Sequence, residues 1–280
     1  MPRLRSSEWL LIAYFAYVAL VSPFFFSPGS NSQWKPLIVA AVVTVLLLRL
    51  ARTKSWLRDL APVLLTLAAF EEMNLYTPAV RDHHLEQSWI VWDRVLLDQY
   101  GLQAGIESAG TLLPMFLELC YALVYVVAPM GLWALSANGR RDRVNQFWLA
   151  YLAGTLGAYA LFPYFISEPP RTAFPGENLP HFLTFLRRFN LWIAGRYDIH
   201  SSVFPSAHVS SVFSAAWGLL ETLPKRRWIG WSMAAFGLCV VVATVYGRYH
   251  YAVDAAAGIA ISLLGLAAVK IADYRNRRGA

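Results

Sequence analysis

The sequence predicts an all-α integral membrane protein, built as a helical bundle of about eight transmembrane helices. Hydrophobic residues make up 57% of the 280 residues and charged residues only 15%, against roughly 45–50% and about 25% in soluble globular proteins. The mean hydropathy is +0.43. The net charge of +7 comes from basic residues that stand between apolar segments rather than in one patch. This pattern excludes a disordered chain and argues against a nucleic-acid partner.

Eight segments are apolar enough to cross a bilayer, which takes about 20 mostly apolar residues. Several carry a tryptophan at or near an end, as expected at a membrane interface. We expect the first to be an uncleaved anchor, because no small-residue cleavage site follows it. The eight segments are 9–26, 34–50, 60–76, 111–135, 146–165, 207–223, 228–246 and 252–272.

The basic residues predict the orientation of these segments. Most of them fall at the chain ends or in alternate connections, such as Arg49–Arg58, Arg140–Arg143 and Lys225–Arg227. The positive-inside rule puts these connections and both termini in the cytoplasm. The six histidines then lie in or beside the opposite, extracytoplasmic face: His83, His84, His181, His200, His208 and His250.

Two further segments, 88–100 and 182–193, combine apolar and charged residues over too short a length to span. We expect helices that lie in the headgroup plane or pack over the ends of the bundle. The two cysteines, Cys120 and Cys239, stand in apolar runs, so neither a disulfide framework nor a cysteine metal site is expected.

Three short stretches on the predicted extracytoplasmic side are rich in residues that bind or transfer phosphoryl groups. They are Glu168-Pro-Pro-Arg171, Phe204-Pro-Ser-Ala-His208 and Arg248-Tyr-His-Tyr-Ala-Val-Asp254. In the third stretch His250 and Asp254 are four residues apart, which predicts one helix face. The carboxylate can then take the proton of one imidazole nitrogen and leave the other as a nucleophile.

The other polar residues of these stretches suit an anion site. Ser206 is a candidate helix cap whose hydroxyl faces an anion, and His208 can protonate a leaving oxygen. Arg171 and Arg248 offer planar forks for phosphate oxygens. Each residue also has a simpler interpretation. A single histidine can be a hydrogen-bonded interfacial group, Arg248 can extend to lipid headgroups, and His250, Asp254 and His208 can be metal ligands.

Taken together, Pro205-Ser-Ala-His208 and His250-x-x-x-Asp254 resemble the type 2 phosphatidic acid phosphatase superfamily. The resemblance implies a six-helix core at residues 57–280, preceded by two extra transmembrane helices at 1–56. It implies that His250 attacks phosphorus to form a phosphohistidine, that Asp254 orients it and that His208 is the general acid. It also implies that Arg171, Ser206 and Arg248 hold the phosphate oxygens. The proposed mechanism needs no metal or organic cofactor.

Departures from the family pattern point to one branch. Where the usual motifs have a lysine, a proline and an arginine, this chain has Tyr164, Thr172 and Thr244. The Pro-Pro-Arg171 form, Arg248 two residues before the histidine, and Trp92-Asp-Arg94 are similar to inositol phosphorylceramide synthases, enzymes of sphingolipid metabolism. A site without the lysine has less positive charge, which favours a lipid phosphodiester donor, unless Arg187, Arg188 or Arg196 replaces it.

We therefore expect a transferase that moves a phosphoinositol-type head group between membrane lipids, which are both donor and acceptor. A lipid phosphate phosphatase acting on phosphatidic acid or polyprenyl phosphates is the first alternative. A non-enzymatic transporter or scaffold is the second, supported by the intramembrane carboxylates Glu71, Glu72 and Glu118. A vanadate-type haloperoxidase is the third, disfavoured by the membrane setting and the missing lysine. The head group, the acceptor and the oligomeric state are left open by the sequence.

Overall fold

The computed structural model describes residues 3–25, 34–53, 55–77 and 82–278, and within these ranges the chain forms helices and no strand. The predicted all-α class is therefore confirmed. The predicted end of the first segment at Phe26 and the basic residue Lys54 lie outside the described residues. The longer helices are α1 (Ser6–Val21), α2 (Lys35–Leu50), α3 (Trp56–Glu72), α6 (Leu112–Leu123), α7 (Val127–Ala137), α8 (Val144–Tyr159), α11 (Ala207–Thr222), α12 (Arg227–Tyr246) and α13 (Ala252–Arg278).

Four stretches of the described chain are long and apolar enough to cross a membrane. They are Ser6–Phe24, Leu112–Ala137, Pro224–Tyr246 and Ala252–Tyr274. The other four predicted spans coincide with α2, α3, α8 and α11, which have only 16 or 17 residues each, short of the roughly 20 that a full crossing takes. The protein is therefore a membrane protein whose described residues include four stretches that could span by length and composition, and the count of eight stays a prediction.

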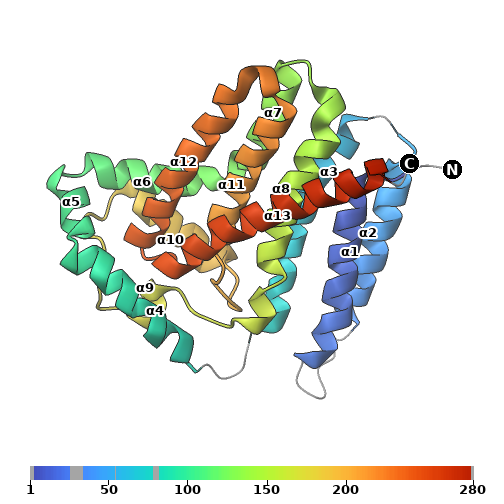
Figure 1. Ribbon diagram of the computed structural model, residues 1–280. Coiled ribbons are helices and arrows are strands. Elements are labelled where there is room, and N and C mark those ends of the chain that lie inside the picture. Colours follow the sequence, from blue (N-terminus) through green and yellow to red (C-terminus); the bar gives the residue numbers. More distant parts are fainter. Residues whose placement is uncertain (1–2, 26–33, 54, 78–81, 279–280) are drawn as a thin grey trace.

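One of these four stretches, Leu112–Ala137, is bent by a 3-10 turn rather than straight. Residues 111–135 were expected to form a single helix, but α6 ends at Leu123 and α7 begins at Val127 after a 3-10 turn. Pro129 explains the break, because it lacks the N–H that would bond to the carbonyl of Tyr125. In Figure 1, α6 runs across the bundle, whereas α7 rises alongside it.

Helix α11 is the central element, with α7, α8, α12 and α13 packed around it (Figure 1). Small residues allow this close packing, as is common between membrane helices. A Cβ on Gly258 of α13 would lie 2.6 Å from the carbonyl oxygen of Ser206, and one on Gly265 would lie 2.8 Å from the backbone nitrogen of Gly154 in α8. Ser210 of α11 donates to the carbonyl of Gly154 at 2.9 Å.

The two N-terminal helices stand at one side of the bundle (Figure 1), and α1 is tied to the rest by ion pairs. Arg58 of α3 forms a two-pronged contact with Glu8, at 2.6 and 2.7 Å. Asp59 accepts from both Arg5 and Arg141, each at 2.7 Å. The division of the chain at residue 56 remains a prediction.

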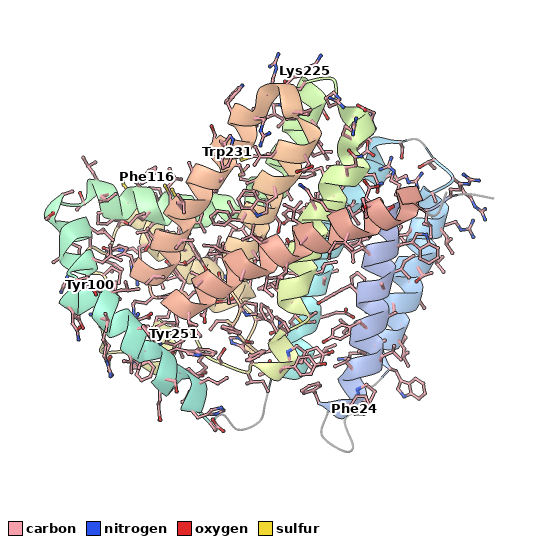
Figure 2. The ribbon with its side chains drawn as sticks, viewed as in Figure 1. Phe24, Tyr100, Phe116, Lys225, Trp231 and Tyr251 are labelled. Carbon is pink, nitrogen blue, oxygen red and sulfur yellow. The ribbon has the colours of Figure 1, made fainter. Side chains whose placement is uncertain are left out.

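Four short helices cover the end of the bundle that carries the histidine motifs: α4 (His84–Arg94), α5 (Leu102–Ser108), α9 (Pro170–Ala173) and α10 (Phe185–Tyr197). The expected surface helices 88–100 and 182–193 correspond to α4, with the π-helical turn Val95–Gln99, and to α10. Figure 2 shows Tyr251 near this end, with Lys225 at the opposite end.

Large apolar side chains cover much of the outer surface, as expected of a protein surrounded by lipid. Helix α2 shows this most clearly, with Leu37, Ile38, Val42 and Val45 all at least half exposed. Tryptophans on the outer surface include Trp9, Trp34, Trp56, Trp133, Trp228 and Trp231.

Candidate active site

The three predicted stretches meet in the structure through backbone hydrogen bonds. The N–H of Ser206 donates to the carbonyl of Asp254 at 3.0 Å, and the N–H of Arg171 donates to the carbonyl of Arg248 at 3.2 Å. Residues 48 and 77 positions apart in the sequence are thereby held side by side. The predicted site residues form one cluster.

The two histidines and the aspartate form a line of contacts. His250 Nε2 lies 3.3 Å from His208 Nδ1, and His250 Nδ1 lies 3.4 Å from Asp254 Oδ2. Asp254 is fully buried and its Oδ2 accepts from the N–H of Tyr251 at 2.9 Å. In the tautomer that carries its proton on Nδ1, His250 directs this proton towards the carboxylate and the lone pair of Nε2 away from Asp254.

The four-residue spacing predicted that His250 and Asp254 share a helix face. In the structure they do not. Asp254 stands in the first turn of α13, but His250 precedes that helix in the turn that follows α12. That turn is a Schellman cap: Tyr249 N–H donates to Thr244 O at 2.9 Å, and Arg248 N–H donates to Val245 O at 3.1 Å. The cap satisfies the last carbonyl groups of α12, so that helix ends before His250. Because α13 begins only at Ala252, His250 lies outside both helices.

Arg248 occupies the left-handed position of this cap, with φ of 59°. Glycine usually takes that position, because a side chain there costs about 1–2 kcal/mol. Arg248 is fully buried and forms an ion pair with Asp93 of α4, so it does not extend to lipid headgroups. Its Nε and Nη2 have no hydrogen-bond partner. Two buried donors of this guanidinium therefore remain unpaired among the residues that the structure describes.

Ser206 is the N-cap of α11, as predicted. Its hydroxyl oxygen accepts from the N–H of Val209 at 3.4 Å, and its own proton remains available for donation. Arg171 Nη2 lies 2.9 Å from Oδ2 of Asp198, and the guanidinium stands 5.3 Å from the ring centroid of Tyr249.

A ladder of aromatic rings positions His208. The ring of Tyr121 stacks on His208 at 4.9 Å on one side and on Tyr249 at 3.9 Å on the other. Tyr125 meets His208 edge-on, and its hydroxyl lies 3.5 Å from Nε2. The bend between α6 and α7 brings these two tyrosines to the site, so the sequence pattern alone did not identify them.

Glu118, a candidate intramembrane carboxylate, is the centre of a buried network. It accepts from Arg187 Nη1 at 2.8 Å, from Asn190 Nδ2 at 2.7 Å and from the Tyr249 hydroxyl at 2.7 Å. Arg187 and Asn190 belong to α10, which buries these polar groups and exposes its aromatic residues, Phe185 among them. The network fixes α10 to α6 and to the residue before His250.

The other two candidate carboxylates lie on α3. Glu72 is buried and neither of its oxygens has a hydrogen-bond partner, whereas Glu71 accepts from Asn74 at 3.3 Å.

Two neighbouring hollows are both lined by His208. The smaller, of about 310 Å³, is lined by His250, His208, Asp198 and Tyr249. The larger, of about 650 Å³, begins at His208 and runs between α3, α7 and α8 along apolar side chains such as Leu67. The hollow that contains both histidines thus lies next to an apolar cleft inside the bundle.

The environment of His250 keeps its imidazole neutral. Burial lowers the pKa of His250 from 6.5 to about 4; the nearby Asp198 carboxylate opposes this shift, and Arg171 adds to it. A neutral imidazole has the lone pair that a nucleophile needs. Within the described residues, no three His, Cys, Asp or Glu side chains are grouped as a metal site requires.

Sequence comparison identifies the family. A family model described as the PAP2 superfamily matches residues 91–268. No curated protein and no solved structure matches the chain. The matched segment includes all three stretches of the cluster and more than half of the sequence, and members of this superfamily are generally phosphatases or phosphotransferases that act on phosphate esters. The chain therefore belongs to the PAP2 superfamily.

Proposed function

We propose that this protein is a membrane-embedded lipid phosphotransferase, which moves a phosphate-containing head group of phosphoinositol type between lipids through a phosphohistidine. One observation carries the proposal: the neutral His250 has Nδ1 beside Asp254 and Nε2 beside His208. A nucleophile, its orienting carboxylate and a proton donor stand in sequence, as double displacement requires.

In the first step His250 Nε2 attacks the phosphorus of the donor lipid. The bond from phosphorus to the diacylglycerol oxygen breaks, and His208 gives its proton to that oxygen. Asp254 stabilises the charge that develops on the His250 ring. The 3.3 Å between the two histidines leaves no space for a phosphorus atom between them, so we expect the His208 ring to turn aside when substrate binds.

In the second step the acceptor hydroxyl attacks the same phosphorus. His208 takes the hydroxyl proton, the bond from phosphorus to His250 Nε2 breaks, and the head group leaves on the acceptor. The Nε and Nη2 donors of Arg248, the Ser206 hydroxyl and Arg171 hold the phosphate oxygens in both steps. Such positioned charge-assisted donors supply much of the stabilisation of phosphoryl transition states.

The apolar cleft that begins at His208 supports lipids as donor and acceptor. A hydrocarbon chain fits its lining, and a chain that fills it excludes water from the histidines. A lipid hydroxyl then competes with water as acceptor, which favours transfer over hydrolysis.

We propose that both termini are cytoplasmic and that the site is extracytoplasmic. The support is the distribution of Lys and Arg: the connection at Lys225 lies at the opposite end of the bundle from Phe24 and Tyr251 (Figure 2), and the positive-inside rule keeps that end in the cytoplasm.

A product assay on detergent-purified protein tests the proposed activity. The protein receives phosphatidylinositol with ceramide or diacylglycerol as acceptor and, separately, phosphatidic acid. We expect head-group transfer that His250→Gln abolishes and that the control His84→Gln, an exposed histidine on the same face, retains. Free phosphate from phosphatidic acid without transfer identifies a phosphatase. Full activity in His250→Gln overturns the mechanism.

A further inference from the structure

Each arginine of the phosphate site already has a carboxylate partner. Arg171 pairs with Asp198 at 2.9 Å, and the buried Arg248 pairs with Asp93. The two guanidinium groups and the two carboxylates together have no net charge. An incoming phosphate therefore meets a site that can bond its oxygens but offers little excess positive charge.

The arginines of the nearby helix α10 do not add an unpaired charge beside Arg171 and Arg248, and Arg188 is exposed. Arg187 is occupied by Glu118 at 2.8 Å, and Arg196 lies over the ring of Trp192. Tyr164, at the position of the family lysine, accepts a hydrogen bond from the hydroxyl of Tyr17 at 3.3 Å and is half exposed.

Asp198 is the carboxylate that faces the reacting groups. It follows α10 directly, where its N–H caps the helix by donating to Ala194 O at 3.2 Å. Its side chain lines the same hollow as His208 and His250, and it also lines a second hollow together with Arg171. Asp93, by contrast, is fully buried and also accepts from the N–H of Ala252 at 2.8 Å, which gives it a structural role at the start of α13.

We infer that Asp198 determines substrate specificity: it makes the site prefer lipids with a singly charged phosphodiester over lipids with a doubly charged phosphomonoester. This inference rests on the proposed function and names its donor class. A phosphate that binds Arg171 must share the guanidinium with Asp198 and lie beside that carboxylate. A diester has one negative charge in this field. A monoester is close to doubly charged above pH 7, and its second charge is repelled.

The experiment compares Asp198→Asn with the wild type. Asparagine keeps the shape of the side chain and an oxygen for Arg171, and removes only the charge. The value of kcat/KM is measured at pH 8 for phosphatidic acid and for phosphatidylinositol. We expect the monoester-to-diester ratio to rise about tenfold or more, because one additional unit charge at close range changes affinity by at least that factor.

Glu221→Gln is the matched control. Glu221 pairs with Lys270 at 2.7 Å and lies 13 residues beyond His208 on α11, about 20 Å along the helix. The substitution Glu221→Gln removes one charge from the protein at a distance from the site. We therefore expect the monoester-to-diester ratio of kcat/KM to stay unchanged. A ratio that Asp198→Asn leaves unchanged, or that Glu221→Gln raises equally, overturns the inference.

A second measurement needs no variant. Glycerol 1-phosphate and its methyl diester are compared as inhibitors of the wild type at pH 8, and we expect the diester to bind about tenfold more tightly. Equal or reversed affinities overturn the inference. Failure of the proposed function has a different signature, because His250→Gln then turns over either lipid at the wild-type rate.

Discussion

Removing the Glu118 carboxylate is expected to destabilise the folded protein severely. Its three side-chain donors, Arg187, Asn190 and Tyr249, all lie within 2.8 Å of its oxygens, and Arg187 is only 4% exposed. Glu118→Ala leaves that guanidinium buried without a counter-ion. Breaking a buried ion pair in this way costs about 3–5 kcal/mol. The substitution also removes the hydrogen bond to Tyr249, whose ring stacks on Tyr121, which in turn stacks on His208.

The assay is unfolding of the purified protein in mixed micelles, followed by tryptophan fluorescence. Replacing both partners, Glu118→Leu with Arg187→Leu, removes the unpaired charge along with its partner. We expect this double variant to be more stable than Glu118→Ala, since an apolar pair can substitute for a buried ion pair at little cost. A loss below about 1 kcal/mol in Glu118→Ala, or a double variant less stable than the single one, would refute this reasoning.

Three further outcomes follow from the site. First, because burial lowers the pKa of His250 to about 4, the acidic limb of kcat/KM for a diester lipid should lie near pH 4; a limb at pH 6.5 or above contradicts this. In the same interval the unfolded chain binds a proton that the folded chain does not, so stability should fall as pH drops from 6.5 to 4. Second, Gly258→Ala places a Cβ 2.6 Å from the Ser206 carbonyl oxygen, so it should lower the free energy of unfolding by about 1–3 kcal/mol and reduce activity. The control Gly157→Ala, whose Cβ meets only Ile261 at 3.4 Å, should change neither stability nor activity. Third, exhaustive EDTA treatment should leave turnover unchanged, and an activity restored only by a divalent cation contradicts the metal-free mechanism.

The helices could be predicted from the sequence because long apolar runs have few other stable structures in lipid. Their lengths could not. The run 111–135 reads as one span, and only the position of Pro129 hints at the break between α6 and α7. Helices α8 and α11 have only 16 residues each, and most of these residues are buried among other helices.

The site followed from short motifs to a large extent. The stretches that contain Arg171, Ser206, His208 and His250 meet as the family resemblance implied. The helical placement of His250 was wrong, since a four-residue spacing also fits a cap followed by a helix, and hydrophobic pattern does not distinguish the two.

The carboxylates that face the arginines could not be predicted in the same way. Asp198 lies in a connection whose fold over the site depends on the buried contacts of Arg187 and Asn190. Asp93 was visible within Trp92-Asp-Arg94, but its partner Arg248 lies 155 residues away. Pairings of this range are set by tertiary packing and have no local signal.

The central claim is that His250 becomes covalently attached to the phosphate-bearing head group. The most direct measurement is intact-protein and peptide mass spectrometry after incubation with a phosphodiester lipid and rapid alkaline quenching, which preserves phosphohistidine. We expect a mass increase equal to the whole phospho-head group on the peptide that contains His250, absent from His250→Gln and present in His84→Gln. An enzyme that turns over lipid with the adduct on another residue, or with none at all, would contradict it.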